Sequence, residues 1–157
     1  MIKLIRNATY SDLKRELSRM LHDGSESPEV RDLALEVTSG DLDDAISAIF
    51  EFVRDNVTYT PDPEDRELFI SPRIMVELIR EGRAYGDCDD MSLFTASLLS
   101  SIGYRTKIIV LALEDDEYDH AIAAVWSEDL QDWIWLDTAS KNPVGWRYDY
   151  HRKIDIE

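Results

Sequence analysis

The sequence predicts an α+β domain in which helices come first and an antiparallel sheet follows. Apolar residues recur every three or four positions as far as Ile102, which indicates helices. Beyond Gly103 the apolar residues form short extended runs, which indicate strands. We expect a single domain over residues 1–157, with a helical lobe at 1–56, a core at 57–145 and a terminal edge strand at 146–157.

Three short helices are expected in the helical lobe. The first covers residues 12–22 and should end at Gly24. Ser27-Pro28 combines a capping residue with a proline in the first turn, and this pattern should start a second helix that ends at Gly40. Asp41 should open the third helix. Their inner faces are marked by Leu13, Leu17, Met20, Leu21, Val30, Leu33, Ala34, Val37, Ile46, Ile49, Phe50 and Val53.

The core should begin with a short extended piece at residues 57–59. Residues 60–67 contain two prolines and four acids, which are typical of a loop. Ser71-Pro72 repeats the pattern that starts a helix. A further helix, which begins at the only cysteine, should run to about Ile102.

An antiparallel meander is expected after that helix. The run Ile108–Leu111 is apolar on both faces, as in a central strand. We expect strands at 104–113, 120–126, 133–137 and 147–156, with an acidic turn at 114–119, a hairpin at 127–132 and irregular structure at 138–145.

Composition limits the classes of partner. The formal net charge of −16 argues against binding to nucleic acid or to an anionic membrane. No apolar run approaches the roughly 20 residues of a membrane span, and no signal peptide is visible. A single cysteine excludes an internal disulfide and fits a reducing compartment, so we expect a cytoplasmic protein without cofactor or structural metal.

That cysteine, Cys88, is the first candidate for chemistry. Asp87 is a plausible N-cap, so Cys88 should lie at a helix N-terminus, where the helix dipole favours a thiolate. The carboxylates of Asp87, Asp89 and Asp90 should oppose this effect and raise the thiol pKa. An activated cysteine therefore requires a nearby histidine.

His120 is the histidine that the strand order favours. It opens one strand of a predicted hairpin, and Asp137 closes the next strand. Because antiparallel neighbours bring the start of one strand beside the end of the next, these two side chains should lie together. If Cys88 lies over the same end of the sheet, His120 can take its proton, leaving a thiolate at neutral pH that attacks an amide carbonyl. The Cys88 backbone N–H could then donate to the oxyanion.

Other interpretations of these residues stay open. A lone cysteine is more often a buried hydrophobe than a nucleophile. The chain could be a non-catalytic binding or assembly module, for example of a phage particle, that keeps the three residues as structure. The Asp87–Asp90 cluster could instead serve a metal-assisted hydrolase, although capping and solvated surface explain it more simply.

Four segments together resemble the transglutaminase-like superfamily: Gly86–Asp90, Leu98–Tyr104, His120-Ala121 and Trp135–Thr138. The resemblance, to small bacterial or phage members, implies a papain-like fold and thiol chemistry on amides, namely cross-linking, deamidation or hydrolysis. It implies Cys88 as nucleophile, His120 as general base and Asp137 as the acid that orients the histidine.

The resemblance leaves the second oxyanion donor open. Many members carry a Trp or Gln before the helix that precedes the cysteine, where this chain has Phe69-Ile70-Ser71. Ser71, Tyr59 or Tyr85 could replace that donor, or the backbone could act alone. The expected partner is a peptide or protein substrate. Association with a virion, the substrate's identity and the oligomeric state are left open.

Overall fold

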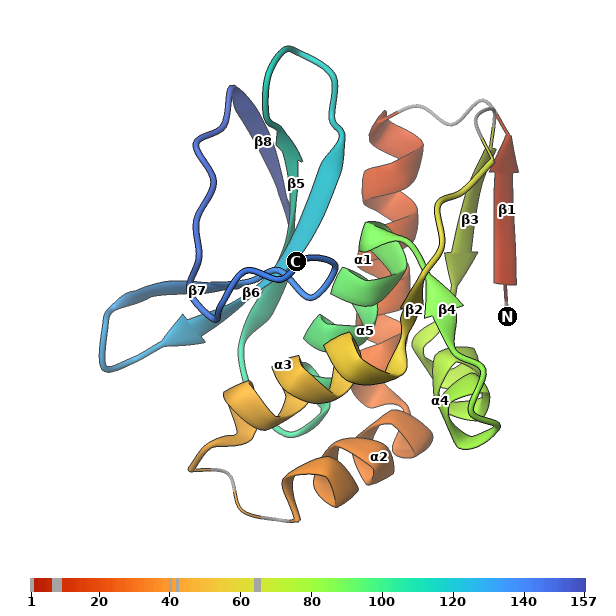
Figure 1. Ribbon diagram of the computed structural model, residues 1–157, viewed down its shortest axis with the longest axis vertical. Coiled ribbons are helices and arrows are strands. Elements are labelled where there is room, and N and C mark those ends of the chain that lie inside the picture. Colours follow the sequence, from red (N-terminus) through yellow and green to blue (C-terminus); the bar gives the residue numbers. More distant parts are fainter. Residues whose placement is uncertain (1, 7–9, 40, 42, 64–65) are drawn as a thin grey trace.

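The computed structural model describes residues 2–6, 10–39, 41, 43–63 and 66–157. It is an α+β fold, as predicted, with helices grouped on one side and a four-stranded antiparallel sheet on the other (Figure 1). The helices are α1 (Tyr10–Glu26), α2 (Pro28–Thr38), α3 (Ala45–Asn56), α4 (Pro72–Arg80) and α5 (Cys88–Ser101). The strands are β1 (Ile2–Arg6), β2 (Thr58–Tyr59), β3 (Arg66–Ile70), β4 (Tyr85–Gly86), β5 (Thr106–Ala112), β6 (His120–Ser127), β7 (Asp132–Leu136) and β8 (Arg152–Ile156).

The sheet has the order β7-β6-β5-β8, with every described pair antiparallel. Strand β8 is an edge strand, as expected, but it is shorter than the predicted 147–156 and pairs with β5. The apolar run in β5 is buried because this strand is central and α5 packs against it. The first three strands therefore form the predicted meander, whereas β8 crosses to the opposite edge of the sheet instead of pairing with β7.

Helix α5 lies at the centre of the fold, between the sheet and the other helices (Figure 1). Residues 90–99 are all buried, because α1, α2, α3 and α4 pack around the helix and the sheet covers the remaining side. In the sequence, the recurrence of Met91, Phe94 and Leu98 at steps of three or four predicts a helix with one apolar face. A helix enclosed on all sides has no solvent face. Its polar residues bond locally, as when Thr95 Oγ1 donates to the Met91 carbonyl over 2.7 Å.

Some predicted boundaries are wrong. Gly24 does not end α1, which continues to Glu26. Part of the predicted loop at 60–67 belongs to β3, which pairs with β1, a strand that the local pattern did not indicate. Helix α3 begins at Ala45 rather than near Asp41, and the expected stop at Gly40 falls outside the described residues.

Both serine-proline helix starts are confirmed. The Ser27 side chain accepts a hydrogen bond from the Val30 N–H, and the Ser71 side chain accepts one from the Ile74 N–H, each at 3.4 Å. No helix in the described parts of the chain is both long and apolar enough to span a membrane.

Gly24 lets α1 approach α5 closely. A Cβ at this position would lie 2.5 Å from Ser97 Oγ on α5 and 2.7 Å from Pro72 Cγ on α4. Ser97 Oγ is itself buried and has no hydrogen-bond partner among the described residues. The close approach therefore depends on the missing side chain at residue 24.

We predict that Gly24→Ala lowers the free energy of unfolding by about 1–3 kcal/mol, the usual cost of overpacking a core. Urea unfolding followed by circular dichroism measures this change. Ser97→Ala is the matched partner variant, because it removes the atom nearest the new methyl group. The double variant should recover part of the loss, and strictly additive effects would contradict the assigned clash.

Candidate active site

Cys88 is the first residue of α5, and its backbone is held by a reciprocal capping box. Asp87 Oδ1 accepts a hydrogen bond from the Asp90 N–H at 3.1 Å, and Asp90 Oδ2 accepts one from the Asp87 N–H at 3.2 Å. This confirms the predicted N-cap. No described residue accepts a hydrogen bond from the Cys88 N–H, which is left as a free donor at the positive end of the helix.

The Asp90 side chain joins three segments at this point. Its Oδ1 accepts from the Ile70 N–H of β3 at 2.9 Å. Gly86, the last residue of β4, packs so closely that a Cβ there would lie 2.6 Å from Asp90 Cβ. The glycine two places before the cysteine is therefore a steric requirement of the capping box.

Burial dominates the ionisation of Asp90. Only 2% of the residue is exposed, and burial, followed by the charge of Asp87, raises its pKa to about 9. The amides of Ile70 and Asp87 act in the opposite direction but do not offset these effects. Asp90 therefore keeps its proton at neutral pH, and the cap carries less negative charge than the sequence suggested.

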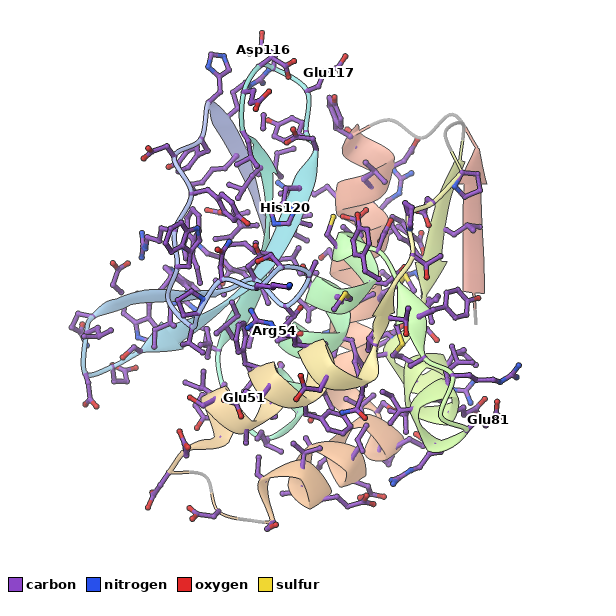
Figure 2. All side chains as sticks on the ribbon, in the orientation of Figure 1. Glu51, Arg54, Glu81, Asp116, Glu117 and His120 are labelled. Carbon is purple, nitrogen blue, oxygen red and sulfur yellow. The ribbon has the colours of Figure 1, made fainter. Side chains whose placement is uncertain are left out.

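Cys88 and His120 line one pocket of about 190 Å³. His120 is the first residue of β6, and it lies away from Asp116 and Glu117 at the tip of the preceding loop (Figure 2). The other lining residues are Leu13, Tyr59, Pro61, Asp62, Asp87, Asp89, Val110, Tyr118 and Asp119. The structure thus brings the predicted thiol and imidazole to the same cavity, although no hydrogen bond joins them within the described part of the chain.

The expectation of a resting thiolate is not supported. Burial raises the pKa of the Cys88 thiol well above its ordinary value, and the charges of Asp89 and Asp87 raise it further. The Ala121 N–H, which favours the anion, does not offset them. Cys88 is therefore a neutral thiol in the resting site.

His120 and Asp137 lie side by side, as the hairpin predicted. Strand β6 pairs with β7, and Asp137 directly follows β7. His120 Nε2 is 3.1 Å from Asp137 Oδ2. With Nε2 bonded to a carboxylate, a neutral imidazole carries its proton there and has its lone pair on Nδ1. No described residue bonds to that second nitrogen.

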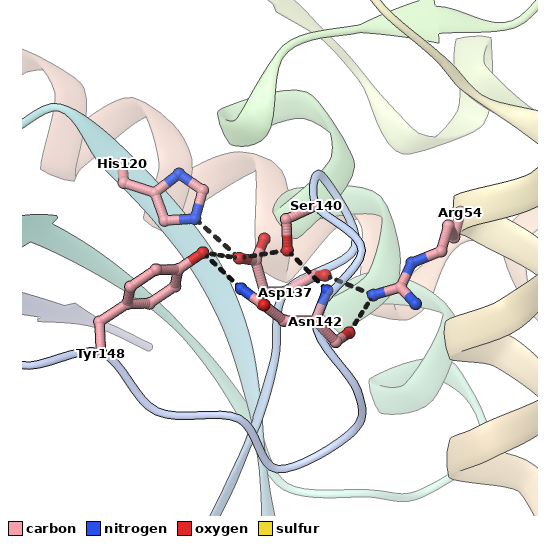
Figure 3. A network of polar contacts seen from close by, with 6 residues as sticks. All are labelled: Arg54, His120, Asp137, Ser140, Asn142 and Tyr148. Carbon is pink, nitrogen blue, oxygen red and sulfur yellow. Dashed lines mark hydrogen bonds and ion pairs between the residues drawn. The ribbon is translucent and has the colours of Figure 1, made fainter.

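Asp137 is held by more groups than the sequence indicated (Figure 3). Ser140 Oγ donates to Oδ2 at 2.8 Å, and the Tyr148 hydroxyl donates to the same oxygen. Burial alone would raise the pKa of Asp137, but the hydrogen bonds from His120, Tyr148 and Ser140 outweigh it, so this pKa is lowered. The carboxylate is ionised at neutral pH.

Arg54 anchors the loop that follows Asp137. Its Nη2 donates to the Asp137 carbonyl at 3.0 Å and also to the Asn142 carbonyl (Figure 3). The guanidinium lies 4.2 Å above the Phe50 ring, one turn earlier on α3. Sequence analysis missed Arg54, Ser140, Asn142 and Tyr148. No local spacing links Arg54 to a loop more than eighty positions away, and the other three lie in an irregular connection whose course no periodic pattern predicts.

The oxyanion candidates separate into two groups. Tyr59 lines the Cys88 pocket, and its pKa is raised mainly by burial and further by the nearby carboxylates of Asp87 and Asp89, so its hydroxyl stays protonated. Ser71 caps α4 and lines a different pocket together with Gly24. Tyr85 is exposed on β4 and is not among the lining residues of the Cys88 pocket. Only Tyr59 and the Cys88 N–H lie where the pocket could use them.

One group of carboxylates could hold a cation. Oxygens of Asp62, Asp87 and Asp90 lie within 4.8 Å of one another. Each of these side chains already accepts a backbone hydrogen bond, Asp62 from the Leu68 N–H at 3.0 Å. The three carboxylates therefore have a structural role, because they hold the backbone of β3 and cap the N-terminus of α5.

The sequence profile of the Transglutaminase-like superfamily matches residues 31–138. Comparison with curated protein sequences gives no match. Solved structures are similar in fold. A candidate cysteine protease from Cytophaga hutchinsonii has a TM-score of 0.55 and 18% identity, and the match covers 88% of this chain and 49% of that chain.

Two further solved structures are also similar to this chain in fold at low sequence identity. A candidate protease from Parabacteroides distasonis has a TM-score of 0.56 and 15% identity, with 83% of this chain and 26% of that chain covered. LapG from Legionella pneumophila, in an EGTA-treated form, has a TM-score of 0.50 and 16% identity, with 83% and 72% covered. At these identities the similarity concerns the fold. The present chain spans about half or less of the length of the first two proteins.

The raised pKa of Asp90 predicts a pH-dependent stability. Because the folded-state pKa of about 9 lies above the ordinary value of 3.8, the contribution of Asp90 is fully present below about pH 4 and is lost as pH rises towards 9. The free energy of unfolding should therefore fall between pH 5 and pH 8.5, as measured by urea titration. Asp90→Asn should flatten this slope, whereas Asp129→Asn on the exposed β6–β7 turn should retain it. An unchanged slope in Asp90→Asn would contradict the assignment.

The charge of Asp89 predicts a change in thiol reactivity. Asp89→Asn removes the largest of the charges that raise the Cys88 pKa. Alkylation of the thiol by iodoacetamide should therefore reach its half-maximal rate at a lower pH, and the rate at pH 7 should rise several-fold. Intact-mass kinetics measure this rate. Asp55→Asn on α3 is the control, and equal rates in both variants would count against the electrostatic cause.

Proposed function

Because the chain belongs to the transglutaminase-like superfamily, we propose that it is a thiol-dependent hydrolase or acyltransferase that acts on peptide or side-chain amide bonds. One observation carries the proposal: a helix N-terminal cysteine and a histidine with a buried carboxylate partner line the same pocket. Cys88 is the nucleophile, His120 the general base and Asp137 the group that orients the imidazole. The substrate is a peptide or protein.

The protonated resting thiol favours general-base catalysis over a preformed ion pair. Nδ1 of His120 accepts the proton from Cys88 as Sγ attacks the carbonyl carbon. The imidazolium that forms is stabilised by Asp137, which is ionised and bonded to Nε2. Because the proton moves only when the sulfur attacks, the raised thiol pKa does not prevent the reaction.

The tetrahedral intermediate carries its negative charge on the former carbonyl oxygen. The free Cys88 N–H is the first donor to this oxygen, and the Tyr59 hydroxyl is the second candidate. When the intermediate collapses, the C–N bond breaks and the departing amine takes the proton from His120. A thioester remains on Cys88. Attack by water completes hydrolysis, and attack by a second amine completes acyl transfer.

A second candidate function is a binding or assembly module without catalysis. The raised thiol pKa supports it, because a neutral buried thiol is also what an inert cysteine shows. In that case the His120–Asp137 pair would only brace the sheet against α3. The two candidates differ in whether Cys88 accepts an acyl group.

We predict that p-nitrophenyl acetate acetylates Cys88, and that His120→Ala lowers the rate by about 10²–10⁴, the usual contribution of a general base. Intact-mass spectrometry detects the acetyl adduct, and Cys88→Ser, whose alcohol is a far weaker nucleophile at this pH, serves as the blank. His22→Ala is the matched control, because 73% of the His22 side chain is exposed. Wild-type acetylation rates in His120→Ala would exclude the catalytic proposal and leave the binding module.

Cleavage or cross-linking of a peptide library then separates the two amide reactions. Products with a new carboxylate indicate hydrolysis, whereas products joined to an added primary amine indicate acyl transfer. Both reactions should be lost in Cys88→Ser. Amide turnover that persists in Cys88→Ser would contradict the thioester route.

A further inference from the structure

The Asp137 carboxylate makes all its side-chain hydrogen bonds through one oxygen. Oδ2 accepts from His120 Nε2, Ser140 Oγ and the Tyr148 hydroxyl, whereas Oδ1 is buried without a partner in the described chain. Three donors on one oxygen prevent the carboxylate from rotating about its χ2 angle. The orientation of the His120 imidazole therefore depends on Ser140 and Tyr148, which fix the carboxylate that it contacts.

Tyr148 contacts both members of the pair. Its hydroxyl bonds to Asp137 Oδ2, and its ring meets the His120 ring edge to face, with centroids 5.2 Å apart and planes at 74° (Figure 3). One residue thus fixes the acceptor of the imidazole proton and also the plane of the imidazole.

The proton directions in this network are determined. Burial, followed by the bond to Asp137, raises the pKa of Tyr148, so its hydroxyl is protonated. Because Asp137 is ionised, the hydroxyl must donate to it. Asn142 Nδ2 then donates to the hydroxyl oxygen at 2.9 Å. The hydrogen bonds therefore run from Asn142 to Tyr148 and from Tyr148 to Asp137, and each donor meets an acceptor.

These residues lie outside the segment that matches the superfamily profile, which ends at residue 138. Ser140, Asn142 and Tyr148 all come from the connection between β7 and β8. Arg54 fastens the start of this connection to α3 through two carbonyls. The connection between β7 and β8 therefore passes beside the site.

We propose that Tyr148, oriented by Asn142, is a positioning residue that shares the Asp137 carboxylate with His120 and so sets the pH at which His120 can act as a base. The inference rests on the proposed function for its kinetic consequence. The hydroxyl withdraws negative charge from Oδ2, which weakens the attraction of that oxygen for an imidazolium. Losing the hydroxyl should make His120 hold its proton to higher pH.

Other titratable side chains near His120 also influence whether the imidazole is protonated. The titratable side chains that share its pocket come from α5 and its N-cap, from the two residues before His120, and from β2 and the segment that follows it. They are Tyr59, Asp62, Asp87, Cys88, Asp89, Tyr118 and Asp119, in addition to Asp137 and Tyr148 on the opposite side. The groups that line the pocket are not bonded to Tyr148, so a shift in Tyr148→Phe reports on the hydroxyl and on the Asp137 carboxylate that it contacts.

The decisive variant is Tyr148→Phe, which keeps the ring and removes only the hydroxyl. The acid limb of the pH–rate profile for p-nitrophenyl acetate should move up by about half a pH unit, which lowers kcat by up to about threefold at the acid end of the profile and leaves KM unchanged. Asn142→Ala should move the limb in the same direction by a smaller amount. Tyr150→Phe is the matched control, because Tyr150 is exposed and packs near Trp135.

Comparison with Tyr148→Leu, which removes the ring as well as the hydroxyl, separates the effect of ring packing from that of the hydroxyl. If Tyr148→Phe behaves as wild type and only Tyr148→Leu loses activity, ring packing alone explains the residue and the proposal is overturned. An acid limb that stays in place while kcat falls, or one that moves to lower pH, also overturns it.

A second measurement does not depend on activity. The imidazole nitrogens of His120, labelled with ¹⁵N and followed by NMR in the folded protein, should show the Nε2–H tautomer in wild type and protonation at higher pH in Tyr148→Phe. If the wild type fails to accept an acyl group, the proposed function is lost, but this titration still decides the role of Tyr148. An unchanged titration would reject that role.

Discussion

The capping box between Asp87 and Asp90 is the constraint on which the rest of the site depends. It begins α5 at Cys88 and leaves the Cys88 N–H free, because the cap satisfies the Asp90 N–H instead. The same carboxyl of Asp90 holds β3 through Ile70 and requires a glycine at position 86. Helix α5 is buried over most of its length, so the position of the sulfur is set by the core and not by a loop.

The electrostatics of the site explain its resting state. The pocket contains several carboxylates beside the thiol, and burial of Cys88 adds to their effect, so the sulfur keeps its proton. On the far side of the imidazole, Asp137 is ionised because three donors surround one of its oxygens. A proton acceptor is thus held ready next to a thiol that has not yet lost its proton, an arrangement suited to proton transfer during attack.

Several features followed from local pattern. Serine-proline pairs started α2 and α4, the apolar run in β5 indicated a central strand, and the hairpin of β6 and β7 brought His120 beside Asp137. Other features did not. The pairing of β1 with β3 and the continuation of α1 past Gly24 depend on partners distant in sequence, which override local preference.

The sequence by itself determined the α+β class, the cap before Cys88 and the pairing of His120 with Asp137, because each depends on short-range spacing or on the adjacency of consecutive strands. Only the tertiary structure decided that Tyr148, Ser140 and Arg54 surround Asp137, that Tyr59 rather than Ser71 lines the pocket, and that the thiol is protonated. These outcomes depend on burial and on contacts between segments far apart in the chain. Burial and long-range contact leave no periodic trace in sequence.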